Sequence, residues 1–257
     1  MDLGDGSTGK FRGRDNREEG ERRDHPRYLG TPWQGLAAGK ALDREPRSGV
    51  RPKKGDRDRL IRLAEARPEW TLGFEDESWF SRFERPSMHS WADAGKPARL
   101  LEKEARKDDP EPKALSCYGL YLPELKETWL RFVDGRAVSS ITTRFLSWCC
   151  HRLQQRSKEA LLLIWDNASW HKSHEVRGWI SAHNRSVKAS GHGIRIVPCL
   201  LPTKSPWLNA IEPQWIHSKR KVVEPERLLG AYELAERVCK VFGCAHEEHL
   251  SIPQEVA

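Results

Sequence analysis

The chain has 257 residues, of which 37% are hydrophobic and 32% charged, and its formal net charge is +7. A basic balance fits a surface that binds polyanions, although many basic proteins bind no nucleic acid. No stretch approaches the ~20 apolar residues that span a bilayer, and the N-terminus lacks the features of a signal peptide. The six cysteines form no CxxC pair, which argues against a zinc site and favours a reducing, cytoplasmic compartment.

The first 54 residues are rich in Gly, Arg, Asp and Glu and have almost no periodic apolar pattern. Such a segment cannot bury enough apolar surface to offset its ordering entropy, so we predict that residues 1–54 are disordered. A short helix is expected over residues 56–67, ended by Pro68. The apolar residues that follow predict one domain over residues 55–250, with a C-terminal tail at 251–257.

From Trp70 onward the apolar pattern predicts three strands and then alternating helices and strands. Strands are expected at residues 70–74, 115–122, 128–133, 161–165 and 194–200. Helices are expected at residues 141–156, at 174–188, from near 209, and at 231–242. The first three strands suggest an antiparallel meander. The whole order describes an α/β fold with a mixed sheet and helices on its faces.

The most informative stretch is the apolar run 161–165, which is followed at once by Asp166. Five consecutive apolar residues predict a buried central strand. Binding sites in α/β sheets cluster at the carboxyl ends of such strands, where Asp166 stands. Because Asn167 follows, a simple Asx turn that closes the strand is the structural alternative.

Two further acidic positions accompany Asp166. The cluster Glu75, Asp76 and Glu77 lies upstream, and Glu212 lies downstream. Two-metal phosphoryl transfer needs carboxylates that converge around two divalent ions about 3.5–4 Å apart, and Mg²⁺ prefers oxygen ligands. The acids together therefore indicate a metal-dependent nuclease centre. Solvated strand-end charges, and a helix cap by Asn209 three residues before Glu212, are the alternatives.

Three segments resemble the catalytic blocks of the DDE transposases: residues 74–79, 165–171 and 201–212. In order, spacing and flanking residues the match runs from about Arg57 to Leu250. It is nearest to the bacterial insertion sequence 630 family, within the mariner-like superfamily. The resemblance implies a ribonuclease H-like fold, a mixed sheet flanked by helices, and metal-dependent cleavage and joining of DNA strands.

By motif position, the resemblance implies that Asp76, Asp166 and Glu212 are the catalytic residues. The same three would be the ligands of two Mg²⁺ or Mn²⁺ ions. Three neighbouring residues are expected to support the acids: Asn167, His171 and Asn209. For His171, a purely structural role is an equal alternative.

Basic and polar residues around the third block are candidate contacts for DNA phosphates. They are Lys204, Ser205, Lys219, Arg220 and Lys221. A solvated loop lysine explains the first of these equally simply. A basic helix end favoured by the helix dipole explains the last three.

Full-length members of the resembled family carry an N-terminal helix-turn-helix region, of which the first 54 residues show no pattern. We therefore expect either a truncated or frameshifted copy or recognition that lies elsewhere. The leading hypothesis is a nucleoid-associated bacterial transposase acting on terminal inverted repeats and target DNA, with a homodimer allowed. The alternatives are a non-mobilising DNA-binding remnant and a structure-selective nuclease unrelated to transposition.

Overall fold

The computed structural model describes residues 53–85, 103–203 and 205–252. All of them belong to one compact unit, residues 50–257. The disorder predicted for the first 54 residues therefore concerns positions almost wholly outside the described residues, and so do Lys204 and most of the predicted tail. No helix within the described ranges is long and apolar enough to cross a membrane.

The centre of the molecule is a five-stranded mixed sheet with the strand order β3-β2-β1-β4-β5. The strands are β1 (Trp70–Ser81), β2 (Ala114–Leu122), β3 (Glu127–Val133), β4 (Ala160–Trp165) and β5 (Arg195–Leu200). The first three pair in antiparallel fashion, which confirms the predicted meander. Strands β4 and β5 run parallel to β1.

Strand β1 is longer than predicted, because it continues through the acidic cluster to Ser81. Glu75, Asp76 and Glu77 therefore lie inside a strand and not in a loop after it. Since successive side chains of a strand point to opposite faces, Asp76 projects from one face of the sheet and its two acidic neighbours from the other.

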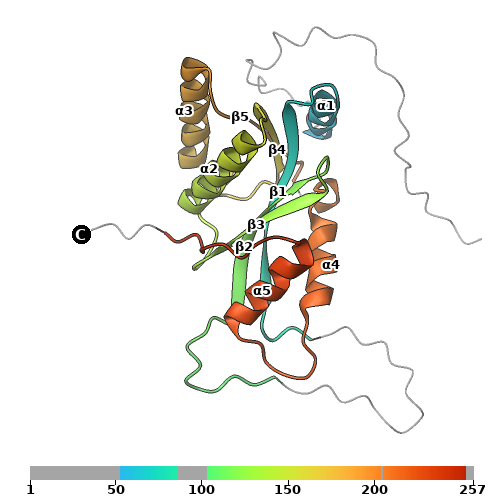
Figure 1. The fold of residues 1–257 in the computed structure, drawn as a ribbon, viewed down its shortest axis with the longest axis vertical. Helices are drawn as coiled ribbons and strands as arrows, with labels where there is room; N and C mark the ends of the chain where they lie inside the picture. Colours follow the sequence, from blue (N-terminus) through green and yellow to red (C-terminus); the bar gives the residue numbers. More distant parts are fainter. Residues whose placement is uncertain (1–52, 86–102, 204, 253–257) are drawn as a thin grey trace, which may run out of the picture. The chain divides into compact units, whose positions relative to one another are not determined.

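In the described part of the chain, five α-helices cover both faces of the sheet (Figure 1). They are α1 (Lys53–Glu65), α2 (Ser139–Gln155), α3 (His174–Ser190), α4 (Glu212–Val222) and α5 (Ala231–Phe242). Helices α2 and α3 pack in one core cluster, and α1, α4 and α5 in the other. The predicted helix near residue 209 begins three residues later, after a 3₁₀ turn at Pro206–Leu208.

Strand β4 separates the two cores, and all six of its residues are buried. Leu162 and Ile164 pack on the side of α1, α4 and α5, whereas Leu161, Leu163 and Trp165 pack on the side of α2 and α3. A strand buried on both faces reads as a continuous apolar run. The mixed sheet and its flanking helices confirm the predicted α/β class.

The segment after α5 returns to the edge strand β3. Leu250 forms a parallel bridge with Val133, and its N–H donates to the Phe132 carbonyl at 2.7 Å. Its own carbonyl accepts from the Asp134 N–H at 2.9 Å. This short pairing covers one stretch of the otherwise open edge of the meander.

Candidate active site

Two of the predicted acids occupy equivalent positions on neighbouring strands. Strands β1 and β4 pair in parallel with Phe74 opposite Ile164. Asp76 and Asp166 each stand two residues farther along the chain. Because the strands are parallel and adjacent, this register brings both carboxylates to the same end of the sheet.

Glu212 reaches that end from a different element, as the first residue of α4. Asp166 and Glu212 line the same open cavity of about 280 Å³. The positive end of the helix dipole favours a carboxylate in the first turn. Burial raises the pKa of Glu212, Lys219 acts in the opposite direction, and the nearby charge of Asp166 raises it further.

Asp76 lies on the face of the sheet covered by α4. Its Oδ2 accepts a hydrogen bond of 3.1 Å from the indole N–H of Trp215. Burial, followed by the charges of Glu75, Glu212 and Glu77, raises the pKa of Asp76 to about 8. The like charges of these neighbouring acids disfavour ionisation of Asp76.

A glycine on β2 makes this approach of α4 to the sheet sterically feasible. Gly119 pairs with Asp76 across the β1–β2 ladder. A Cβ atom at Gly119 would lie 2.4 Å from Cη2 of Trp215 and 2.9 Å from Cδ1 of Ile211. This contact between Gly119 and Trp215 was not predicted from the sequence. The one feature of the sequence that hints at it is the spacing of Trp215 three residues after Glu212, which places both side chains on the same face of α4.

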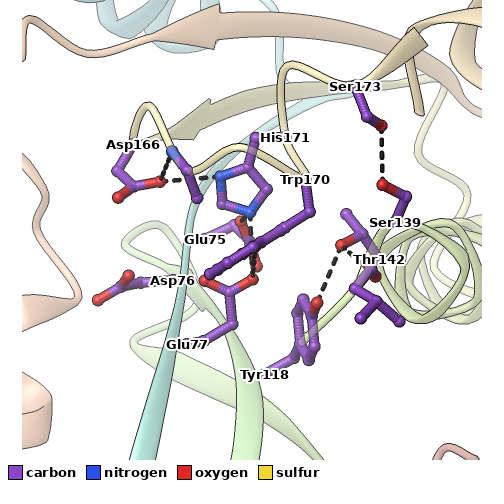
Figure 2. A network of polar contacts seen from close by, with 12 residues as sticks. Glu75, Asp76, Glu77, Tyr118, Ser139, Thr142, Asp166, Trp170, His171 and Ser173 are labelled. Atoms are coloured by element: carbon purple, nitrogen blue, oxygen red, sulfur yellow. Dashed lines mark hydrogen bonds and ion pairs between the residues drawn. The ribbon is translucent and has the colours of Figure 1, made fainter. Parts of the chain in front are cut away.

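The opposite face of β1 carries a separate polar network centred on the buried His171. Its Nδ1 lies 2.9 Å from Oδ1 of Asp166, and its Nε2 lies 3.2 Å from Oε1 of Glu77 and 3.2 Å from Oε2 of Glu75. The indole N–H of Trp170 donates to the same Glu77 oxygen at 2.6 Å. Figure 2 shows the side chain of Asp76 directed away from this network.

The charges in this network fix the orientation of Asp166. Burial lowers the pKa of His171, but the charge of Glu75 and the hydrogen bonds to the three carboxylates raise it to about 12. The ring is therefore an imidazolium that donates from both nitrogens. Although burial acts to raise the pKa of Asp166, the bonds from His171 and the Ala168 N–H hold it below its usual range. The bond from Ala168, at 2.7 Å, forms the Asx turn that the sequence suggested as the structural alternative.

The donor atoms at this end of the sheet suit a hard divalent cation, because they are carboxylate oxygens. Within the described residues, the one group of three candidate ligands that converges within 4.8 Å is Glu75, Glu77 and His171. Both ring nitrogens of His171 face carboxylate oxygens, so this group is an ion-pair network as it stands. The oxygens of Asp76, Asp166 and Glu212 are spread more widely, as expected of mutually repelling carboxylates.

Glu75 is the least satisfied group of the site. Its side chain is fully buried, and neither of its oxygens has a hydrogen-bond partner of good geometry. Burial raises its pKa to about 7, against the lowering effect of His171. The positive group beside this buried carboxylate is His171, whose Nε2 lies 3.2 Å from Oε2.

Two asparagine side chains form hydrogen bonds to the backbone of segments that bear the candidate site. The Asn209 amide donates to the Glu75 carbonyl at 3.0 Å, and the Asn167 amide donates to the Leu201 carbonyl. The interpretation of Asn209 as a helix cap is wrong, because the residue that precedes α4 is Ile211 and Asn209 reaches into the sheet instead. Asn167, Asn209 and His171 thus all contact segments that bear the predicted acids.

The candidate DNA contacts occupy two places. Ser205 lines the cavity with Asp166 and Glu212, whereas Arg220 and Lys221 are exposed in the last turn of α4. Lys219 is partly buried, with its Nζ 5.2 Å from the ring centroid of Trp79. Lys204 lies outside the described residues.

The family model described as DDE superfamily endonuclease matches residues 71–233, which is more than half of the chain. This range contains Asp76, Asp166 and Glu212. No curated protein matches the chain at the level of sequence.

Solved structures of Mos1 share the fold. The "Mos1 mariner paired end complex with Mn" superposes with a TM-score of 0.53 at 15% identity, covering 82% of this chain and 60% of that one. The "Mos1 Strand Transfer Complex" gives 0.51 at 15% identity, covering 75% and 53%. The chain thus spans between about half and three fifths of the Mos1 chains. The likeness confirms the predicted ribonuclease H-like fold.

Proposed function

Since the chain belongs to the DDE superfamily of endonucleases, we propose that it is a transposase that cleaves DNA and joins the cut strand to a target. Asp76, Asp166 and Glu212 are its catalytic carboxylates in this proposal. The observation that carries it is their arrangement: two acids at matching positions of parallel strands β1 and β4, and a third that lines the same cavity as Asp166.

The protein groups around the acids have distinct tasks in this proposal. The Trp215 N–H holds one oxygen of Asp76. His171 and the Ala168 N–H both bind Oδ1 of Asp166, so its other oxygen stays available at the half-exposed side chain. These bonds orient the carboxylates before substrate arrives, which reduces the reorganisation needed during reaction.

Asp76, Asp166 and Glu212 would hold Mg²⁺ or Mn²⁺, and we propose two ions. Bound divalent ions supply stabilisation of the negative charge that develops on the oxygens of a phosphodiester. The raised pKa values of Asp76 and Glu212 support this assignment, because a cation offsets the repulsion that causes part of the shift.

The substrate in this proposal is duplex DNA at terminal inverted repeats, followed by target DNA, and the family is the insertion sequence 630 family of bacteria. Ser205 would contact DNA beside the cavity, and Lys219, Arg220 and Lys221 along α4. The catalytic domain would span residues 55–250, and Lys204 would be a further DNA contact. A homodimer would bring two DNA ends together, in line with the paired end complex of Mos1.

Cleavage of DNA by Asp166→Asn and Glu212→Gln variants tests the proposal. The substrate is a supercoiled plasmid that carries the DNA flanking this gene, incubated with the full chain and Mg²⁺ or Mn²⁺. We expect each variant to lose at least about a hundredfold in cleavage rate while it binds the plasmid as tightly as the wild-type chain does.

Asp108→Asn and Glu104→Gln are matched controls, because both side chains are exposed and lie outside the proposed site. The controls should cleave at the wild-type rate. Cleavage that survives Asp166→Asn would exclude the catalytic assignment. Plasmid binding without cleavage by the wild-type chain would favour the DNA-binding remnant, and cleavage of RNA–DNA hybrids alone would favour a nuclease unrelated to transposition.

A further inference from the structure

Two histidines just beyond α5 face each other at short range. Nε2 of His246 lies 3.1 Å from Nε2 of His249. The other ring nitrogen of each histidine faces a carboxylate: Nδ1 of His246 lies 2.9 Å from Oε1 of Glu236, and Nδ1 of His249 lies 2.8 Å from Oδ1 of Asp134. The four side chains form a continuous chain from α5 to the end of β3.

The carboxylates determine which nitrogen of each ring carries hydrogen. A carboxylate accepts hydrogen bonds, so both Nδ1 atoms must be donors. Two neutral rings would then direct two Nε2 lone pairs at each other across 3.1 Å. That arrangement is repulsive unless a positive group lies between the nitrogens, either a shared proton or a metal cation.

The spacing fits a metal cation. Zinc binds imidazole nitrogen at about 2.0–2.1 Å in tetrahedral geometry, so two such nitrogens lie about 3.3 Å apart. Metal-binding histidines usually donate their second N–H to a carboxylate, which fixes the tautomer and the ring orientation. Both features occur at His246 and His249. Imidazole ligands suit zinc, whereas magnesium prefers oxygen.

We propose that His246 and His249 bind Zn²⁺ through their Nε2 atoms, with Glu236 and Asp134 orienting the rings. Two protein ligands leave coordination positions for solvent or another small donor. The cysteine pattern argued against zinc, but it tested only sites built on CxxC pairs. This site uses none of the proposed catalytic residues and does not depend on the proposed function.

The surroundings permit entry of an ion and hold the rings in place. The His249 side chain is 25% exposed, and that of His246 is 10% exposed. Both rings pack on Phe132 of β3, with centroids 5.4 and 5.5 Å away. A zinc ion here would join α5, the end of β3 and the C-terminal segment that bridges to the sheet edge.

Zinc content of the full chain tests the site. The chain is stripped with a chelator, dialysed against Zn²⁺ in excess Mg²⁺, and analysed by atomic emission. We expect wild type and the control His151→Gln, an exposed histidine of α2, to retain about one more Zn²⁺ per chain than the doubly substituted His246→Gln/His249→Gln variant. Equal zinc content in all three would overturn the proposal and assign a shared proton to the ring pair.

Glu236→Gln provides a second measurement that keeps both imidazoles. It should weaken zinc binding by about ten- to a hundredfold, because the ring of His246 loses its carboxylate partner. Circular dichroism establishes that this variant is folded. Unchanged zinc affinity in folded Glu236→Gln would contradict the proposed geometry even if the doubly substituted variant did not fold.

Discussion

The two faces of β1 carry acidic side chains that differ in how they are hydrogen-bonded. On the α4 face, Asp76 accepts a hydrogen bond from Trp215, and burial raises its pKa to about 8. On the other face, Glu77 accepts from both Trp170 and His171. Adjacent residues of a single strand thus contribute to two different sets of contacts, of which the one with Asp76 belongs to the proposed reactive centre. Strand alternation, and not distance along the chain, separates the two roles.

The largest expected effect is on the rate of DNA cleavage, when Asp76 and Glu77 are substituted separately. Asp76→Asn should reduce DNA cleavage at least about a hundredfold, because the proposed metal centre loses a ligand. Glu77→Gln should reduce it only about tenfold, since Glu77 acts through Trp170 and His171. Rates with Mg²⁺ on the same plasmid measure both. If Glu77→Gln proves the more damaging change, the assignment of the two faces is reversed.

The free energy of unfolding should also distinguish the two faces of β1. His171→Gln should lower the free energy of unfolding by roughly 3 kcal/mol, because it removes the cation beside the buried Glu75. The doubly substituted chain Glu75→Gln/His171→Gln should recover part of that loss, since no buried carboxylate then remains without a counter-charge. Urea unfolding in the absence of divalent ions measures both. Purely additive losses would mean that the two residues are not coupled.

The close approach of α4 to the sheet gives a smaller effect. Gly119→Ala should cost about 1–3 kcal/mol of stability, because the new Cβ would meet Trp215 at 2.4 Å. Gly178→Ala is the matched control: nothing lies within 4 Å of its Cβ position in α3. It should gain about 0.5–1 kcal/mol from helix propensity. A neutral Gly119→Ala would show that Trp215 shifts freely and does not hold Asp76.

Local patterns predicted most of the fold. The apolar run of β4 identified a central strand, and the periodicity of α5 gave its bounds at Ala231 and Phe242. The extent of β1 was not predictable from local pattern, because the acidic residues at its centre oppose strand formation in isolation. Pairing of this acidic stretch with β2 overrides that preference.

The candidate site was only partly visible in the sequence for a related reason. Motif resemblance singled out Asp76, Asp166 and Glu212, whose catalytic roles stay predictions. The burial of Glu75, the contact of Gly119 with Trp215, and the pairing of His246 with His249 depend on how distant segments pack. Asn209 illustrates the limit: its spacing from Glu212 suggested a cap, whereas tertiary structure directs its amide to β1.

The bridge between Val133 and Leu250 has a consequence for self-association. Strand β3 is an edge of the sheet, and unpaired N–H and C=O groups at an edge are a template for pairing with another chain. Leu250 uses the Phe132 carbonyl and the Asp134 N–H that would otherwise face outward. The residues after α5 therefore protect this edge of the meander from strand-to-strand aggregation.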